Sequence, residues 1–140
     1  MAGRMVAVGC GYRHLTLLGS LWALPNTLIG LGFALLSAAV PRWREGMLIA
    51  ESTRGLAYLF LTRRGFGAIT FGRVMISAAP ITRELLVHES HHVRQYEVLG
   101  PFFIPVYLVL QARYGYAKNP LELEAAACAA QTSSAPTSTG

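Results

Sequence analysis

The chain has 140 residues, of which 53% are hydrophobic and 14% are charged, so it is long enough for one domain and more apolar than an ordinary soluble domain. Its net charge of +5 comes from arginines, with Lys118 as the single lysine, and no run of basic residues is interleaved with aromatic ones. This pattern favours contact with anionic lipid headgroups and predicts no nucleic-acid partner. The chain has no aspartate, which excludes a Ser-His-Asp triad, an aspartate dyad and an EF-hand.

A long uncharged stretch covers residues 15–40, after a short N-terminal segment of residues 1–14. As a helix rising 1.5 Å per residue it would exceed the roughly 30 Å hydrocarbon core of a bilayer, which predicts a transmembrane helix. Pro25 lies inside the stretch and predicts a kink, or a break into two half-helices of a re-entrant hairpin. Two alternatives are a signal peptide with small residues at 37–39 as its cleavage site, and a buried helix of a soluble domain.

The arginines around this stretch predict an orientation in the membrane. Arg4 and Arg13 precede it, and Arg42, Arg44 and Arg54 follow it. The excess of a single arginine after the stretch favours the cytoplasmic side for the rest of the chain, including any metal site there.

Residues 47–78 contain short runs rich in aliphatic, aromatic and β-branched residues, at 47–51, 55–63 and 68–77. They predict a small antiparallel β-sheet, with a glycine-containing hairpin turn at 63–67. An edge strand of such a sheet could bind an extended peptide by strand addition, or the sheet could serve only to pack on the next helix.

The next predicted element is a helix over residues 83–99, with Thr82 as its N-cap and Gly100-Pro101 at its end. The uncharged stretch 98–112 is short and contains two prolines, which predicts an interfacial or re-entrant segment, or an apolar wall over a site. Asn119-Pro120 starts a last helix, and the composition of residues 131–140 predicts a disordered tail. The fold class expected is therefore α+β.

The predicted helix 83–99 contains the sequence His88-Glu89-Ser90-His91-His92, which fits H-E-x-x-H. Residues four apart lie one turn apart on one face of a helix, so His88 and His92 can bind one zinc ion. Glu89 is placed to hold and deprotonate a zinc-bound water. His91 points to the side of this face, which favours a supporting or surface role for it.

A catalytic zinc needs a third protein ligand and keeps a further position for water. The chain has no later histidine, so the candidates are Glu97, Glu122, Glu124 and Cys128. Glu97 is five residues past His92, about half a turn away around the helix, and should not converge on the metal. Glu122 and Glu124 follow on the last helix, and this reasoning leaves both open.

The stretch HESHHVRQY followed by NPLELEA resembles the zincin-like metallopeptidases of the gluzincin type. Residues 20–127 also resemble small bacterial membrane proteins with H-E-x-x-H-x-x-Q-Y, GPFFIPVY and NP-x-E-x-E-A. The resemblance implies an anchored zincin-like domain over residues 41–130, with Glu122 as the third zinc ligand. An E-x-x-x-D motif of that superfamily would place an acid at Ala126, and this chain departs from the motif there.

The function expected is a membrane-anchored zinc metallopeptidase that hydrolyses peptide bonds of a peptide or protein substrate. The alternatives are a non-enzymatic membrane protein with a degenerate or structural metal site, and a metal-free interaction module. A lipid bilayer is the other expected partner, and the sequence predicts no oligomeric state. Gln95 could line the cleft, and candidates for stabilising the developing oxyanion are His91, Tyr96, Tyr107, Tyr114 and Tyr116.

Overall fold

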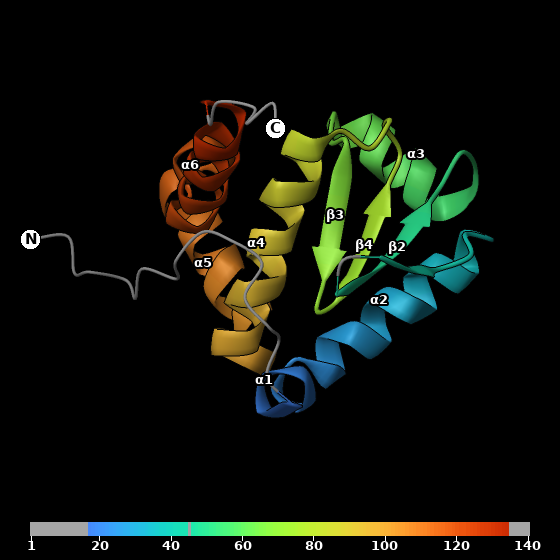
Figure 1. The fold of residues 1–140 in the computed structure, drawn as a ribbon, viewed down its shortest axis with the longest axis horizontal. Helices are drawn as coiled ribbons and strands as arrows, with labels where there is room; N and C mark the ends of the chain where they lie inside the picture. Colours follow the sequence, from blue (N-terminus) through green and yellow to red (C-terminus); the bar gives the residue numbers. More distant parts are fainter. Residues whose placement is uncertain (1–16, 45, 135–140) are drawn as a thin grey trace, which may run out of the picture.

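The computed structural model describes residues 17–44 and 46–134 (Figure 1). A four-stranded sheet lies between helices α2 and α3 on one face and helix α4 on the other, and α5 and α6 lie beyond α4. The α+β class is confirmed. The predicted N-terminal segment 1–14 and the start of the predicted membrane segment lie outside the described residues. In chain order the first elements are α1 (Leu17–Trp22), α2 (Leu24–Leu36), β1 (Arg42–Arg44), β2 (Met47–Glu51) and α3 (Gly55–Arg64).

The remaining elements carry the H-E-x-x-H sequence and everything after it. They are β3 (Ala68–Phe71), β4 (Val74–Ser77), α4 (Arg83–Leu99), the 3₁₀ turn η1 (Gly100–Phe102), α5 (Phe103–Tyr114), the 3₁₀ turn η2 (Tyr116–Lys118) and α6 (Pro120–Ser134).

The helical stretch predicted over residues 15–40, with a kink or a break near Pro25, forms two helices in the described part of the chain. Helix α1 ends at Trp22 and α2 begins at Leu24, with Pro25 in the first turn of α2, where its missing N–H removes no helical hydrogen bond. The predicted interruption near Pro25 is therefore present. Among residues 17–44 and 46–134, no helix is both long and apolar enough to cross a membrane.

Polar side chains anchor the start of α2 to the rest of the fold. The Asn26 side chain donates to the Gly100 carbonyl at 2.7 Å, and the Arg73 backbone N–H donates to the Thr27 hydroxyl at 3.1 Å. At Gly100 (φ +54°) a side chain would collide with the Trp22 ring, so glycine permits α1 to approach the end of α4. Helix α2 is thereby tied to the end of α4 and to the β3–β4 turn.

The sheet has the strand order β1-β2-β4-β3 and is mixed, so the predicted all-antiparallel sheet is wrong. Strands β1 and β2 pair antiparallel, as do β3 and β4, but β2 and β4 run parallel. The reason is that the chain crosses over between β2 and the β3–β4 hairpin through a helix. Strand β3 lies at one edge of the sheet.

The run 55–63, predicted as a strand, forms helix α3. Ala57 and Leu61, four residues apart, are both buried, whereas Leu59 between them is 46% exposed. This spacing has the period of a helix, since alternation in a strand would put all three side chains on one face. Gly65 has the expected positive φ, +71°, but it caps α3, and the hairpin turn contains Gly72 instead.

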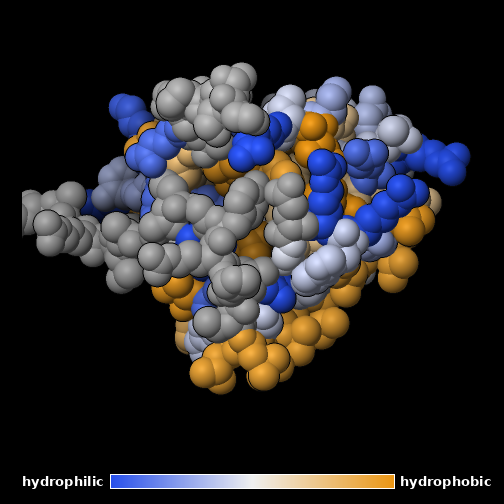
Figure 2. Space-filling model, in the orientation of Figure 1, coloured by the Kyte–Doolittle hydropathy of each residue, from blue (hydrophilic) through white to orange (hydrophobic). Residues whose placement is uncertain are grey.

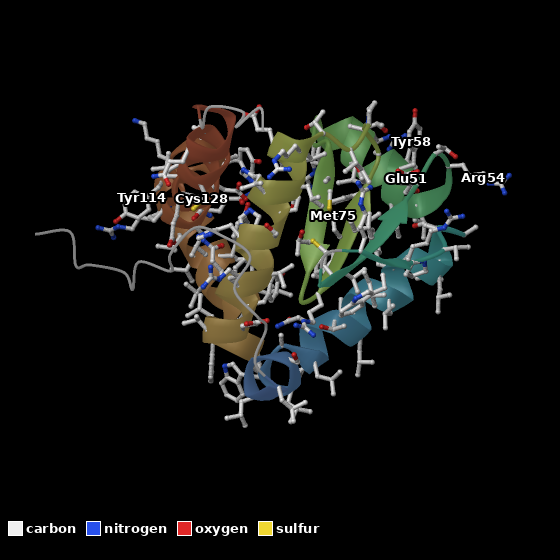
Figure 3. The ribbon with its side chains drawn as sticks, viewed as in Figure 1. Glu51, Arg54, Tyr58, Met75, Tyr114 and Cys128 are labelled. Atoms are coloured by element: carbon white, nitrogen blue, oxygen red, sulfur yellow. The ribbon has the colours of Figure 1, made fainter. Side chains whose placement is uncertain are left out.

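Alternating side chains of the sheet fill two cores. Val74 and Ile76 point towards α2 and α3, where they pack with Leu61. Met75 points towards α4 and packs with Leu86, on the side of the sheet where Figure 3 shows it. Full burial of such a side chain stabilises the folded state by roughly 1.5–3 kcal/mol, so packing on the sheet fixes the position of α4.

The helix predicted over residues 83–99 is confirmed as α4. The Leu85 backbone N–H donates to the Thr82 hydroxyl at 3.1 Å, and the helix ends before Gly100. The stretch 98–112 contains the end of α4, then η1 and most of α5. Helix α6 begins at Pro120 and runs to Ser134, past residue 131 where the tail was expected to begin; residues 135–140 lie outside the described residues.

Candidate metal centre

Two histidines one turn apart on α4 face the first turn of α6. The Nε2 atom of His88 lies 3.1 Å from Oε2 of Glu122, and Nε2 of His92 lies 3.4 Å from Oε1 of the same carboxylate. One ligand atom from each of the three side chains lies within 4.8 Å of the other two. The structure thus brings together the three residues expected to bind zinc.

Glu122 is placed by the start of α6. The Asn119 side chain accepts a hydrogen bond from the Leu121 backbone N–H at 3.1 Å, and Leu121 is buried against α4 and α5. The Tyr107 hydroxyl donates to Oε1 of Glu122 at 2.7 Å. Burial acts to raise the pKa of Glu122, but its contacts with His88, His92 and Tyr107 lower that pKa well below its usual range.

Gln95 holds the ring of His92 from the other side. The Gln95 amide N–H donates to the Leu121 carbonyl at 3.1 Å, so its Oε1 faces His92 and accepts from Nδ1 at 2.8 Å. When the ring is neutral and its proton is on Nδ1, the lone pair is on the other ring nitrogen, Nε2, and is directed at Glu122. Gln95 therefore fixes the orientation of the His92 ring.

The charge state of His92 depends on these neighbours. Burial acts to lower its pKa, but the Glu122 hydrogen bond, the Glu89 and Glu122 charges and the Gln95 hydrogen bond together raise it to about 9. His92 therefore carries a proton at neutral pH in the metal-free protein.

Glu89 is buried and directed at the edge strand β3. Its Oε2 accepts a hydrogen bond of 2.6 Å from the Thr70 hydroxyl on that strand. The backbone carbonyl of Thr70 in turn accepts from the Tyr96 hydroxyl at 3.0 Å. Burial, followed by the Glu89 charge, raises the pKa of Tyr96, which keeps its hydroxyl a donor. The carboxylate is thus held by a strand that itself is held by α4.

The other candidates for a third metal ligand, Glu97, Glu124 and Cys128, contact residues outside the group of His88, His92 and Glu122. Glu97 pairs with Arg73 at 3.4 Å. Glu124 lies 3.2 Å from Nε2 of His91, and the Cys128 sulfur lies 3.4 Å from Nδ1 of the same ring. His91 is outside the three-residue group, as expected, but it is buried between α4 and α6 and has no surface role.

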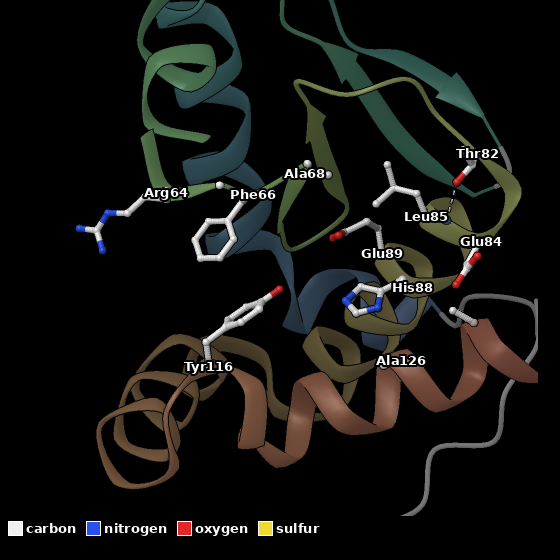
Figure 4. A pocket seen from close by; sticks show the side chains of 13 residues that line it. Arg64, Phe66, Ala68, Thr82, Glu84, Leu85, His88, Glu89, Tyr116 and Ala126 are labelled. Carbon is white, nitrogen blue, oxygen red and sulfur yellow. Dashed lines mark hydrogen bonds between the residues drawn. The ribbon is translucent and has the colours of Figure 1, made fainter. Parts of the chain in front are cut away.

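A pocket of about 560 Å³ opens beside this group (Figure 4). His88 and Glu89 line it from α4, and Ala126 lines it from α6. Phe66 and Tyr116 form the opposite wall, with their ring centroids 5.0 Å apart. The face of α4 that carries His88 and Glu89 is therefore accessible from a cavity.

Among the five predicted oxyanion candidates, Tyr116 lines this pocket. His91 is packed against α6, the Tyr96 hydroxyl bonds to Thr70 and the Tyr107 hydroxyl bonds to Glu122. The Tyr114 hydroxyl accepts from its neighbour Arg113 at 3.2 Å. Burial, followed by the charges of Glu122 and Glu89 and a hydrogen bond to Glu122, raises the pKa of Tyr116 to about 12, so its hydroxyl stays protonated at neutral pH.

The donor set fits zinc. Two imidazole nitrogens and one carboxylate oxygen are ligands that zinc uses in catalytic sites. Tetrahedral ligands about 2.1 Å from zinc lie about 3.4 Å from one another, close to the 3.1 and 3.4 Å found between the histidines and Glu122. The residues present could hold a metal ion with only small adjustments of their side chains.

Sequence reasoning missed Thr70 and understated Gln95. Thr70 stands in a strand with no local pattern that points to Glu89, which lies 19 residues later. Gln95 did carry a signal, since it lies three residues after His92, a spacing at which two side chains meet on a helix.

Comparison with known proteins adds no assignment to this geometry. No protein-family model, no curated protein and no solved structure matches the chain.

Proposed function

We propose that this protein is a zinc-dependent peptidase of the gluzincin type. The observation that carries the proposal is the convergence of His88, His92 and Glu122 from two helices. Glu89 is next to His88 in the sequence, and His88 and Glu89 line one pocket. A metal site with a structural role alone has no need of an adjacent carboxylate and an open cavity.

Zinc bound by these three side chains would acidify a water molecule and polarise the scissile carbonyl. Glu89 would accept the proton of that water. Its Oε2 is held by Thr70 at 2.6 Å, so Oε1 is the atom assigned to take the proton and pass it to the leaving amine. Tyr107 and Gln95 would keep Glu122 and His92 oriented while this happens.

Tyr116 would stabilise the carbonyl oxygen as it gains negative charge. Its side chain lines the pocket wall opposite His88 and Glu89, and its pKa of about 12 keeps the hydroxyl protonated. A preorganised donor of this kind typically contributes about 10²–10³ in rate.

An extended peptide is the substrate that the surroundings favour. Strand β3 is at the edge of the sheet, and its first residue, Ala68, lines the pocket together with Leu85 and Phe66. A substrate strand alongside β3 could place one side chain against these apolar groups. Hydrogen bonds from the strand would hold its backbone in place.

The test is to replace Glu89 by glutamine, which keeps the shape of the side chain and removes the base. Glu89→Gln should retain zinc and lose at least about 10² in kcat on a peptide library. Glu51→Gln, an exposed glutamate at the end of β2, is the control and should keep full activity. Activity that survives Glu89→Gln contradicts the mechanism; zinc binding without turnover by the wild-type protein supports a structural metal site instead.

A further inference from the structure

We infer that the outer face of α1 and α2 docks on a lipid bilayer and lies flat in its interface. This inference goes beyond the proposed peptidase activity and does not depend on it. The docking face consists of eight aliphatic side chains that are between 44% and 79% exposed. They are Leu17, Leu18, Leu21, Leu24, Leu28, Ile29, Leu35 and Leu36.

The orientation of α2 is the reverse of a surface helix in water. Asn26, Thr27, Gly30 and Ala34 are its buried residues, while four of its five leucines, Leu24, Leu28, Leu35 and Leu36, are exposed. A helix on a water-soluble domain turns its apolar side towards the core and its polar side to solvent. The medium outside α2 is therefore expected to be apolar.

Aromatic contacts join α1 and α2 of the docking face to neighbouring elements. Trp22 lies against Phe102, with ring centroids 6.2 Å apart, and Phe33 of α2 lies edge-on to Phe60 of α3 at 6.3 Å. Figure 2 shows the apolar surface as a band along the lower edge of the molecule, where Figure 1 places α1 and α2. Soluble monomers expose single apolar side chains, but rarely a continuous band of this kind.

The charges beside the docking face match a membrane with anionic headgroups. Residues 17–41 contain no charged side chain. Directly after them come Arg42, Trp43 and Arg44, all exposed, with Trp43 at 63%. Tryptophan prefers the boundary between hydrocarbon and headgroups, and arginine next to it pairs with lipid phosphates.

A bilayer fits this face better than a protein partner does. Protein interfaces combine apolar groups with hydrogen-bonding ones, roughly one hydrogen bond per 100–200 Å², whereas the eight side chains of the docking face have no polar atom. Helix α2 is also fixed along its length, by Asn26 to Gly100, by Thr27 to Arg73 and by Ser37 to Ala57 at 2.8 Å. Only its outer side is available to the membrane, as in a helix that lies in the interface.

This orientation places the metal centre away from the bilayer. Gly100, at the end of α4, is next to Trp22, and His88 lies 12 residues earlier on that helix. At 1.5 Å per residue the separation along α4 is about 18 Å. If the proposed peptidase function holds, the peptide bonds cleaved lie outside the hydrocarbon core.

Flotation of the full-length protein with phosphatidylcholine–phosphatidylglycerol vesicles tests the inference. The wild type should float with the vesicles, and Leu28→Asp/Leu35→Asp should reduce the partition coefficient roughly tenfold or more, since each leucine removed from lipid weakens binding substantially. Leu108→Asp is the matched control, because Leu108 on α5 is 57% exposed and Leu28 is 58% exposed. It should bind like the wild type. Arg42→Gln/Arg44→Gln should lose the preference for anionic over pure phosphatidylcholine vesicles.

The two tryptophans give a second readout that needs no leucine variant. Trp22 and Trp43 are the only tryptophans of the chain; Trp22 lies between Leu21 and Leu24 of the docking face, and Trp43 follows the face in the sequence. Both are exposed. Brominated lipid should quench the remaining tryptophan in both Trp22→Phe and Trp43→Phe.

Three results overturn the inference. The first is a wild type that neither floats nor is quenched. The second is equal loss of binding in the Leu28/Leu35 and Leu108 variants. The third is a dimer in solution that Leu28→Asp/Leu35→Asp converts to a monomer without any vesicle binding by the wild type, because a second copy then covers the face.

Discussion

The Nδ1 atom of His92 lies 2.8 Å from Oε1 of Gln95, and the amide N–H of Gln95 reaches the carbonyl of Leu121, one residue before Glu122. One side chain therefore orients a histidine on α4 and ties it to the backbone that carries the carboxylate on α6.

Removing this contact should weaken metal binding without removing a ligand. Gln95→Leu is expected to reduce zinc affinity by about 10–100-fold, because the imidazole of His92 loses the acceptor that orients it. Competition with a chelator of known affinity measures the change. Gln95→Glu keeps an acceptor at the same place and should bind zinc closer to the wild type. Equal zinc affinity in Gln95→Leu and wild type would show that the contact has no such role.

The pH dependence of stability should differ between zinc-free and zinc-loaded protein. The pKa of His92 is raised to about 9 when no metal is bound, so its protonation stabilises the folded state fully below the unfolded pKa of about 6.5. That stabilisation is lost as the pH rises through about 9. Zinc competes with the proton on His92, so the zinc-loaded protein should not lose this stabilisation as the pH rises. The Tm difference between the two forms is therefore expected to widen over this range.

Thermal unfolding of both forms, with His92→Gln as control, measures this effect. The control has no group that titrates at residue 92, so its zinc-free form should lose less stability across the same pH range. A parallel decline in wild type and control would assign the effect to other groups.

Thr70 is predicted to be a positioning residue for Glu89. In the wild type the Thr70 hydroxyl donates to Oε2 of Glu89 at 2.6 Å. Valine in Thr70→Val has nearly the same shape as threonine but no hydroxyl to donate. We expect kcat to fall by about tenfold or more, with KM and zinc content little changed. Thr70→Ser restores the donor and should recover most of the rate. A change in KM with kcat unchanged would contradict a role of Thr70 through Glu89. So would a Thr70→Ser variant whose kcat stays as low as that of Thr70→Val.

The packing of α3 leads to a stability prediction with an internal control. Leu61 is fully buried in the core between the helices and the sheet, and Leu59 is 46% exposed. Leu61→Ala should lower the free energy of unfolding by about 2–5 kcal/mol, and Leu59→Ala by no more than about 0.5 kcal/mol. Urea unfolding measures both. Similar losses at the two positions would favour the strand arrangement expected from the sequence.

The elements that were predicted well have strong local signals. The cap at Thr82, the end at Gly100 and the start at Asn119-Pro120 each depend on a few neighbouring residues. The run 55–63 lacked such a signal, because its many apolar residues suit either a helix or a strand. Its packing on β2 and β4 decides for the helix.

The site shows the same division between local and distant contacts. His88 and His92 could be predicted to lie together, because four residues form about one helical turn. The position of Glu122 rather than Glu124 depends on the rotation of α6 against α4, and the contact of Thr70 with Glu89 depends on how β3 packs on α4. No spacing in the sequence encodes either relationship.

The most direct measurement of the central claim is the zinc content of the purified protein after dialysis, compared between Glu122→Gln and Glu124→Gln. The two glutamates are two residues apart on α6, and the metal site proposed uses only the first. The wild type and Glu124→Gln should retain one zinc ion per chain, whereas Glu122→Gln, His88→Ala and His92→Ala should lose it. A wild type without zinc, or zinc retained by Glu122→Gln as well as by Glu124→Gln, would contradict the proposed centre.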